Sequence, residues 1–526
     1  MNDETPSPVR PDELILSLDC GTQSVRALLF DLQGRLLAKC QQSLDDYVSH
    51  QDGWLEHDAE AFWQAAAGVC RGLWQTHAHL RSAVKGLVVT TQRGTLVPVD
   101  AQGQALRPFI IWLDQRRASK ARPVAPWWRL AFKAARVDGT IDYFSREAEI
   151  NWIAEHEPEV ARRTHKLLLL SGWFNYKLTG RFADSVACQV GYLPFDFKRQ
   201  DWAASWDWKW QALATTREQM PELLPVGSTL GGLTREAAAA CGLPEGLPVI
   251  AGAADKACEI VGAGAIAPDV GALSYGTTAT IDITTPRYVE ALPFIPPYPA
   301  LLPGQYNTEV QIFRGYWMVS WFKEQFGHPE CAAAGEQGVV PEVLFDQLVR
   351  AVPPGSEGLM LQPYWTPGIR HPGPDARGAV IGFSDVHTRA HLYRAILEGL
   401  AYALREGAER IQRRGGTTIR SLRVSGGGSQ SDAALQLTAD IFNLPTSRPH
   451  TYETSGLGAA IAGAVGLGFH RDHVSAVAAM TRLGQTFEPV PAHAERYEAL
   501  YQRVYKRMYE PLRPLYAELQ DILRPH

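Results

Sequence analysis

Residues 247–284 read LPVIAGAADKACEIVGAGAIAPDVGALSYGTTATIDIT. Their pattern changes from a strand to a turn of small residues, a short helix, a Gly/Pro connection and a hairpin, which predicts a domain boundary. The hairpin segment ALSYGTT at 272–278 has a counterpart, LSLDCGT, at 16–22. Both segments place a small-residue turn between two apolar strands near the start of each half, so the sequence predicts an internal duplication.

The size of the chain agrees with such a division. Its 526 residues exceed what one hydrophobic core usually supports, and they predict two large domains or several small ones. Strands and amphipathic helices alternate from Leu14 onward, which favours a layered α/β architecture. Residues 1–12 are polar and contain prolines, which predicts a loose tail.

Composition and charge exclude several classes of protein. No stretch approaches 18 consecutive apolar residues, and the start, MNDETPSPVRPDE, has the wrong pattern for a signal peptide, so neither a membrane partner nor secretion is expected. The seven cysteines are scattered without a Cys-x-x-Cys pair, which indicates a reducing cytoplasm. The net charge of −5 argues against nucleic acid as the main ligand but does not exclude small anions.

The turn after the first strand is a candidate phosphate site. Gly21 lets backbone N–H groups approach an anion that a Cβ would keep away, and Thr22 and Ser24 lie in the same turn. Asp19, at the end of the strand, is placed to hold Mg²⁺ through water. The alternative is a plain hairpin turn with an Asx hydrogen bond.

Two further segments contain candidate functional residues, although their sequence signals are weaker. Gly426, Gly427 and Gly428 lie between a strand and a helix, where unblocked amides can face a nucleotide, although they match no P-loop. Asp255 follows LPVIAGAA and begins a short helix, so it is either a helix N-cap or a general base.

Taken together, these segments resemble the FGGY carbohydrate kinase family, within the actin, hexokinase and heat-shock-70 ATPase superfamily. The resemblance spans nearly the whole chain. It is carried by LDCGTQSVR at 18–26, TTQRGTLVPVDAQGQALRPFIIWLDQRR at 90–117, YFSREAEINWIAEHEPE at 143–159, AGAADKACEIVGAG at 251–264, SYGTTATI at 274–281, GAVIGFSDVHTRAHLYRAILEGLAY at 378–402 and SGGGSQSDAALQLTADIFNLP with ETSGLGAAIAGAVGLG at 453–468.

The resemblance implies an α/β protein of two ribonuclease-H-like domains around a central cleft. Residues 13–263 would form the N-terminal domain with the sugar site and the catalytic base, and residues 264–526 the C-terminal domain with the nucleotide site. The implied activity is phosphorylation of a sugar or polyol hydroxyl, with ATP and Mg²⁺ as cofactors. We expect a small-molecule partner, a cytoplasmic location and no nucleic acid or membrane, and a homodimer is left open.

The family's functional positions carry over residue by residue. Asp255 matches the catalytic base and Asp19 the metal-site carboxylate. The phosphate and nucleotide positions match Gly21, Thr22, Arg26, Gly276, Thr277, Gly427 and Gly428. The substrate positions of the glycerol kinase branch match Gln92, Arg93, Trp112 and Tyr143.

Two departures bear on the substrate. Gly94 stands where the glycerol kinase motif has an acid, which removes a hydroxyl acceptor and favours a ketose or polyol larger than glycerol. Lys256 stands where the family usually has Asn or Gln. It either offers a cation to the substrate or points elsewhere, since successive helical residues are turned about 100° apart.

Three functions compete at this point. The first is an ATP-dependent sugar or polyol kinase, which includes glycerol kinase proper as an alternative. The second is an ATP-gated clamp on the same fold, which would need a peptide-binding domain beyond the two ATPase halves, where one helical segment is expected. The third is a non-catalytic regulatory homologue, which the presence of Asp255, Asp19 and both Gly-Thr turns disfavours.

Overall fold

The computed structural model describes residues 13–339, 341–366 and 372–523. It forms two compact units. The first comprises the residues up to Gly262 with Tyr298–Tyr306 and Glu453–Thr481, and the second comprises Ala263–Pro297, Asn307–Tyr452 and the residues from Arg482 on. The tail predicted at residues 1–12 lies outside the described ranges. Within those ranges, no helix is long and apolar enough to cross a membrane.

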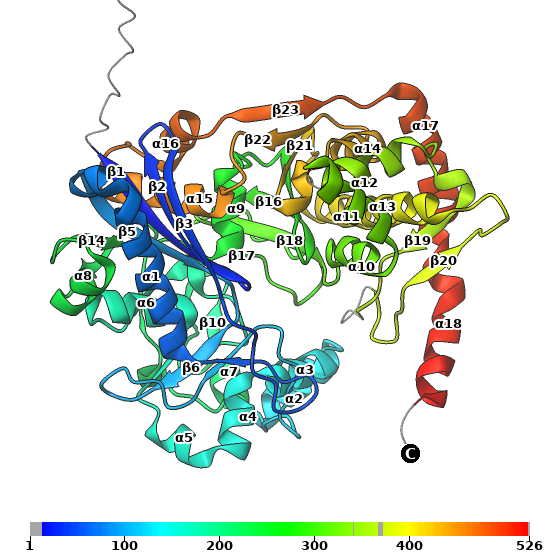
Figure 1. Ribbon diagram of the computed structural model, residues 1–526. Helices are drawn as coiled ribbons and strands as arrows, with labels where there is room; N and C mark the ends of the chain where they lie inside the picture. Colours follow the sequence, from blue (N-terminus) through cyan, green and yellow to red (C-terminus); the bar gives the residue numbers. More distant parts are fainter. Residues whose placement is uncertain (1–12, 340, 367–371, 524–526) are drawn as a thin grey trace, which may run out of the picture. The chain divides into compact units, whose positions relative to one another are not determined.

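The first unit is built on a six-stranded sheet of order β13-β14-β5-β1-β2-β3 (Figure 1). In that order the strands are Thr229–Gly232, Pro248–Ile250, Val84–Thr91, Leu14–Cys20, Ser24–Asp31 and Leu36–Ser43. Strands β1, β2 and β3 form an antiparallel meander, whereas β1 and β14 both run parallel to β5. The carboxyl ends of β1, β5 and β14 therefore meet at one edge of the sheet.

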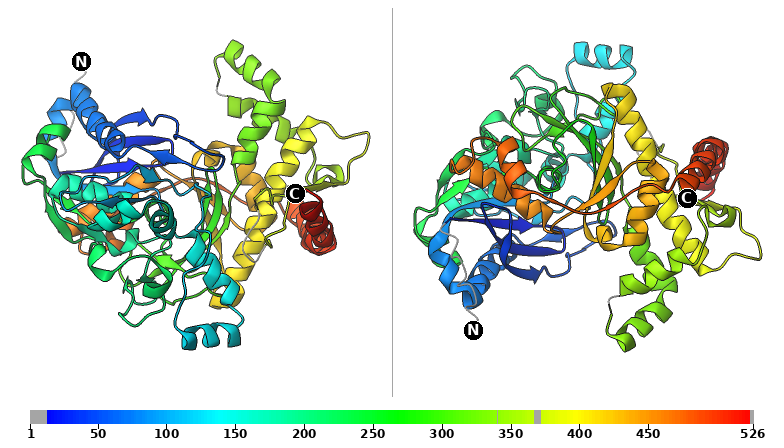
Figure 2. Two further views of the ribbon diagram at one scale, coloured as in Figure 1. Left: turned by 90° about the horizontal axis from the view of Figure 1, so that it is seen from below. Right: turned by 90° about the horizontal axis from the view of Figure 1, so that it is seen from above.

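Strand β1 is buried throughout because helices cover both faces of its sheet. Leu14, Leu16 and Leu18 join a core with the helix α1 (Ala59–His77). The alternate residue Ser17 donates from Oγ to the Gly456 carbonyl of α15 (Thr454–Gly466), at 2.8 Å on the opposite face. Figure 2 shows the blue strands between the blue helix α1 and the orange helices that include α15. Because successive side chains of a strand point to opposite faces of its sheet, β1 contacts α1 on one face and α15 on the other.

The second unit repeats this sheet plan. Its strands follow the order β18-β16-β15-β21-β22-β23. They are Tyr306–Ile312, Ala279–Thr285, Val270–Tyr275, Ser421–Ser425, Thr446–Pro449 and Leu483–Phe487. As in the first sheet, a hairpin (β15 and β16) is followed by two parallel neighbours (β21 and β22) and an antiparallel edge strand. The α/β class and the duplication predicted from the two Gly-Thr turns are confirmed.

Helices complete each unit. Those of the first unit also include α2 (Pro126–Ala134), α3 (Asp138–Glu147), α4 (Glu149–His156), α5 (Pro158–Arg163), α6 (Leu170–Thr179), α8 (Arg235–Cys241), α9 (Asp255–Gly262) and α16 (His473–Met480). Those of the second include α10 (Trp317–Phe326), α11 (His328–Gln337), α12 (Pro341–Arg350), α13 (Arg389–Gly415), α14 (Asp432–Phe442), α17 (Pro491–Leu500) and α18 (Lys506–Ile522). Near the C-terminus, Tyr497, Tyr501 and Tyr505 recur at helical spacing and are buried around Tyr402 of α13.

The units differ from the predicted domains in two segments that belong with the first unit. Residues 453–481 join it because α15 packs backbone to backbone on α9. A Cβ on Gly458 would lie 2.0 Å from the Cys258 carbonyl oxygen, and one on Gly262 would lie 2.0 Å from that of Thr454. Tyr298–Tyr306 also belongs there, since the Tyr306 hydroxyl donates to the Lys198 carbonyl at 2.6 Å.

Candidate functional site

Three parallel strands bring the predicted residues of the first unit together. Asp19 is the last residue but one of β1, Gln92 follows β5, and Asp255 follows β14 after four small residues. The Thr90 hydroxyl donates to the Ala253 carbonyl at 2.9 Å, which ties the last two strand ends together. In open α/β sheets, ligands bind outside the carboxyl ends of parallel strands, so this edge is the candidate site.

The turn between β1 and β2 is tight and open to solvent. Gly21 N–H donates to the Ser24 carbonyl at 3.1 Å, and a Cβ on Gly21 would meet only that oxygen, at 3.8 Å. An anion can therefore approach the backbone here. Arg26, opposite Asp19 in the hairpin register, donates to both Asp19 and Glu453 at 3.3 Å.

The Asp19 carboxyl is buried and surrounded by charge. Burial raises its pKa to about 7 against the lowering effect of Arg26, and the carboxylates of Asp255, Glu453 and Glu259 raise it further. Several acidic groups thus share one poorly solvated region. Bringing a cation to that region would relieve their mutual repulsion.

Asp255 is the first residue of α9. Its Oδ1 accepts a hydrogen bond from the N–H of Lys256 at 2.7 Å, whereas the N–H of Cys258 donates to the Ala254 carbonyl. The carboxylate therefore does not cap the helix in the usual way, through the N–H of the second or third helical residue. Burial raises its pKa, and the charges of Arg93 and Lys256 partly offset that rise.

The side chain of Lys256 turns along its own helix. Its Nζ donates to Glu259 Oε2 at 2.7 Å, one turn further on. Arg93 lies with its guanidinium over the ring of Tyr298, 5.0 Å from the centroid. Tyr298, Glu259 and Glu453 were not among the predicted site residues, and only tertiary packing brings Tyr298 and Glu453 here.

Gln92 and Trp112 both contact Thr22, in the turn between β1 and β2. The indole N–H of Trp112 donates to Thr22 Oγ1 at 3.1 Å, and the Thr22 hydroxyl donates to Gln92 Oε1 at 3.2 Å. Gly94, with φ +64°, donates from its N–H to the Val190 carbonyl at 3.1 Å and leaves room beside Trp112.

Tyr143 occupies a separate cluster. It lies in α3, where Arg117 stacks over its ring at 5.6 Å and Tyr192 packs against it edge-on at 6.4 Å. Burial and the Glu147 charge raise its pKa. Within the described part of the chain, Tyr143 is thus placed with Arg117, Tyr192 and Glu147 rather than in the group formed by Gln92, Trp112 and Thr22.

In the second unit, the two predicted nucleotide loops meet at a pair of tyrosines. Tyr316 N–H donates to the Gly276 carbonyl at 3.2 Å, and its ring stacks on Tyr275 at 4.3 Å. A Cβ on Gly428 would lie 2.4 Å from the Tyr316 ring, so this glycine is required for packing. Trp317 N–H donates to the Thr277 carbonyl at 3.3 Å.

Gly427 differs from its neighbours. A Cβ there would meet nothing within 4 Å, whereas Gly426 has φ +81° and lies against the backbone of Tyr275. The glycine with the left-handed conformation is therefore Gly426, and the one that leaves open space above the loop is Gly427. Gly276 is similarly open, because its nearest contact would be the Thr278 oxygen at 3.6 Å.

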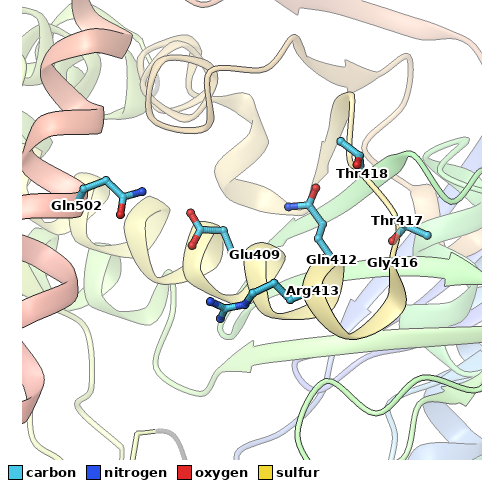
Figure 3. Close-up of a pocket in the computed structure, with 7 residues that line it drawn as sticks. All are labelled: Glu409, Gln412, Arg413, Gly416, Thr417, Thr418 and Gln502. Atoms are coloured by element: carbon cyan, nitrogen blue, oxygen red, sulfur yellow. The ribbon is translucent and has the colours of Figure 1, made fainter.

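The cavities described within the second unit lie elsewhere. One, of about 710 Å³, lies at the C-terminal end of α13. Its lining residues, drawn in Figure 3, are Glu409, Gln412, Arg413, Gly416, Thr417, Thr418 and Gln502. A second, of about 660 Å³, borders Asp432 and Ala433 at the start of α14. Neither lining includes Gly276, Thr277, Gly427 or Gly428. Among the described residues, no group of three or more His, Cys, Asp and Glu side chains could hold a metal.

Comparisons with known proteins bear on both units. The N-terminal domain model of the FGGY family of carbohydrate kinases matches residues 14–262, and its C-terminal domain model matches residues 271–467.

Curated relatives match along nearly their whole length. An uncharacterised sugar kinase of Escherichia coli K12 is 29% identical over 94% of this chain and 92% of its own. A xylulose kinase of Staphylococcus epidermidis is 29% identical over 97% of this chain and 99% of its own. A glycerol kinase of Dechloromonas aromatica is 29% identical over 94% of this chain and 96% of its own. The crystal structure of a xylulose kinase from Rhodospirillum rubrum covers 96% of this chain and 100% of its own, with 28% identity and a TM-score of 0.80.

Proposed function

This chain belongs to the FGGY family of carbohydrate kinases, and we propose that it transfers a phosphoryl group from ATP to a hydroxyl of a ketose or polyol larger than glycerol. Carbohydrate kinase activity follows from the family. The size of the substrate rests on one observation, Gly94. Where the glycerol kinase branch has an acid, this backbone adopts φ +64° and has no side chain beside Trp112.

Asp255 is proposed as the general base. It lies at the strand edge next to Arg93, and its carboxylate makes no usual helix cap. A raised pKa brings a carboxylate nearer to the pH at which it can take a proton from an attacking hydroxyl. The charges of Arg93 and Lys256 oppose the effect of burial on the pKa of Asp255 and so favour its ionised form.

The proposed phosphate contacts lie where glycines leave the backbone open. In the first unit these are Gly21 and Thr22 with Arg26, and in the second they are Gly276, Thr277 and Gly427 with Gly428 as their packing support. Phosphoryl transfer needs positioning and charge stabilisation more than covalent chemistry from the protein, and backbone amides supply both.

Mg²⁺ is proposed at Asp19. The buried carboxyl, with further carboxylates nearby that raise its pKa, is a region that a divalent cation would stabilise. The small number of protein ligands also fits Mg²⁺, which takes one or two carboxylates together with water and substrate phosphates. When bound, the ion would neutralise charge that develops on the transferred phosphoryl group.

The setting proposed for this activity is the cytoplasm, where ATP is available. All seven cysteines are free, as a reducing compartment requires. A homodimer and the absence of a nucleic-acid partner remain proposals that sizing chromatography and a DNA-binding assay would test.

A substrate panel tests the function directly. Glycerol, four- to six-carbon polyols and ketoses are each offered with Mg-ATP, ADP release is coupled to an absorbance readout, and thermal shift is measured in parallel. We expect at least one ketose or larger polyol to be phosphorylated and to raise the melting temperature by mass action. A clear preference for glycerol identifies glycerol kinase proper, and ATP hydrolysis that no sugar stimulates identifies the clamp or regulatory alternative.

A further inference from the structure

Thr22 joins the proposed sugar segment to the proposed phosphate turn through its side chain. Its hydroxyl lies between the indole N–H of Trp112 at 3.1 Å and Gln92 Oε1 at 3.2 Å. These partners are 90 and 70 residues away in the sequence. The parallel register of β1 and β5, with Cys20 beside Thr91, brings the following residues of both strands together.

The surrounding backbone holds this arrangement in place. Gln92 N–H donates to the Cys20 carbonyl at 2.9 Å, and the Tyr47 hydroxyl donates to the Thr22 carbonyl. Trp112 N–H donates to Thr95 Oγ1 at 3.3 Å. Since Gln92 is only 3% exposed, its amide has few alternative partners in water. The three side chains therefore act as one unit.

The chemistry of a hydroxyl limits what Thr22 can do. A hydroxyl has one proton to donate and two lone pairs that accept. In this structure the proton is directed to Gln92, and Trp112 uses one lone pair. A phosphate oxygen is an acceptor, so the Thr22 side chain can bind it only if the hydroxyl turns its proton away from Gln92.

We propose that Thr22 couples the binding of the two substrates by this exchange of hydrogen-bond partners. When a nucleotide phosphate takes the Thr22 proton, the buried Gln92 Oε1 loses a donor, and a sugar hydroxyl can replace it. Because a buried acceptor without a donor is costly, each ligand then favours the other. No covalent bond changes, and the only proton movement is the rotation of one hydroxyl. The coupling between substrates rests on the proposed function.

The first experiment measures coupling by calorimetry. The affinity for the best panel sugar is determined with and without a saturating non-hydrolysable Mg-ATP analogue. In wild type we expect the analogue to tighten sugar binding about fivefold or more, within the usual range of coupling energies. Thr22→Val should abolish that effect and bind sugar more tightly than wild type in the absence of nucleotide, because Gln92 is already free. Thr22→Ser should restore the coupling.

A residue with only a structural role would give a different pattern. Loss of such a residue would weaken sugar binding both with and without the Mg-ATP analogue. The hydroxyl that Thr22→Ser retains would then not change the ratio of the two sugar affinities. Thr76→Val, which removes an exposed hydroxyl at the end of α1, is the control and should leave the coupling unchanged. Equal sugar affinities with and without the analogue in wild type would overturn the proposal.

A second readout needs no sugar. With 5-fluorotryptophan incorporated, the resonance of Trp112 is assigned from its loss in Trp112→Phe. The Mg-ATP analogue alone should shift this resonance in wild type and Thr22→Ser but not in Thr22→Val, because the indole bonds the hydroxyl that turns. A wild-type resonance that does not respond overturns the exchange. If the resonance responds while no panel sugar binds, the exchange at Thr22 stands and the proposed sugar substrate is wrong.

Discussion

Gly458 of α15 lies so close to Cys258 of α9 that a Cβ on the glycine would stand 2.0 Å from the Cys258 carbonyl oxygen. The backbone of α9 carries Asp255 at its start. Close packing of the two helices therefore fixes the position of the proposed base relative to the strand edge, through a distant segment of the chain that belongs to the same unit.

Gly458→Ala should consequently destabilise the protein. The added methyl group meets backbone rather than a flexible side chain, and overpacking of this kind costs about 1–3 kcal/mol. Urea unfolding measures the loss. Gly335→Ala in α11 is the matched control, because a Cβ there meets nothing within 4 Å, and it should stabilise by about 0.5–1 kcal/mol through helix propensity. Equal stabilities for wild type and Gly458→Ala would show that α15 can move away from α9.

Asp255→Asn should lower turnover roughly 100-fold or more while leaving ATP and sugar affinities nearly unchanged, as the loss of a general base predicts. The pH dependence gives an independent check. Burial raises the pKa of Asp255, and the base works only when ionised, so wild-type kcat should fall as the pH drops through that raised value. The midpoint should lie above the ordinary aspartate pKa of about 3.9. Residual turnover of Asp255→Asn should lack this acid limb, and near wild-type turnover in the variant would remove Asp255 from the mechanism.

Gly94→Glu should move specificity toward glycerol. A Cβ at Gly94 would be at ordinary contact distance from Trp112, 3.5 Å, so there is space for a side chain, although φ +64° adds strain of about 1–2 kcal/mol. A hydrogen bond to a charged group contributes about 1.5–3 kcal/mol, so the ratio of kcat/KM for glycerol over the best larger substrate should rise about tenfold. Gly94→Gln, which adds bulk without charge, separates the two effects. An unchanged ratio in both variants would mean that position 94 does not face the substrate.

Glu149→Gln should stabilise the protein at neutral pH. Burial raises the pKa of Glu149 to about 8, with Asp114 and Glu147 adding to the rise. A carboxyl whose pKa is higher in the folded state contributes stability that is full below its unfolded pKa of about 4.3 and is lost as the pH rises toward 8. The amide has no such loss, so the variant should be more stable at pH 8 by about 1.4 kcal/mol or more, the value of one pKa unit. Urea unfolding at pH 5 and pH 8 measures this difference, with the exposed Glu236→Gln as control. A Glu149→Gln variant that shares the wild-type dependence on pH would contradict it.

The sequence pattern predicted the secondary-structure elements of this protein better than the contacts between distant segments. The two Gly-Thr turns identified both hairpins, and the alternation of strands with helices identified the α/β class. Neither pattern could say that Tyr298 reaches Arg93, because a contact between distant segments depends on tertiary packing. The link from Thr22 to Gln92 was within reach in principle, since residues that follow two adjacent parallel strands must emerge side by side. Predicting this link required the knowledge that β1 pairs with β5.

The three glycines between β21 and α14 allow the sharpest test of the nucleotide loop. They look alike in sequence, yet Gly428 is packed against Tyr316, Gly426 is in the left-handed region, and Gly427 has open space above it. Gly427→Val should therefore fold normally and raise the Kd for the Mg-ATP analogue tenfold or more, because the new side chain occupies the space proposed for the nucleotide.

Paired calorimetry on Gly427→Val, with the analogue and then with sugar alone, measures this effect after equal melting temperatures have been shown. Sugar affinity without nucleotide should not change, since Gln92, Trp112 and Asp255 belong to the first unit and Gly427 to the second. Gly428→Val is the contrasting variant and should lose stability instead, because its side chain meets the Tyr316 ring at 2.4 Å. Unchanged affinity for the analogue in a well-folded Gly427→Val would leave this loop as a structural connection between strand and helix, and would assign the nucleotide to other residues of the second unit.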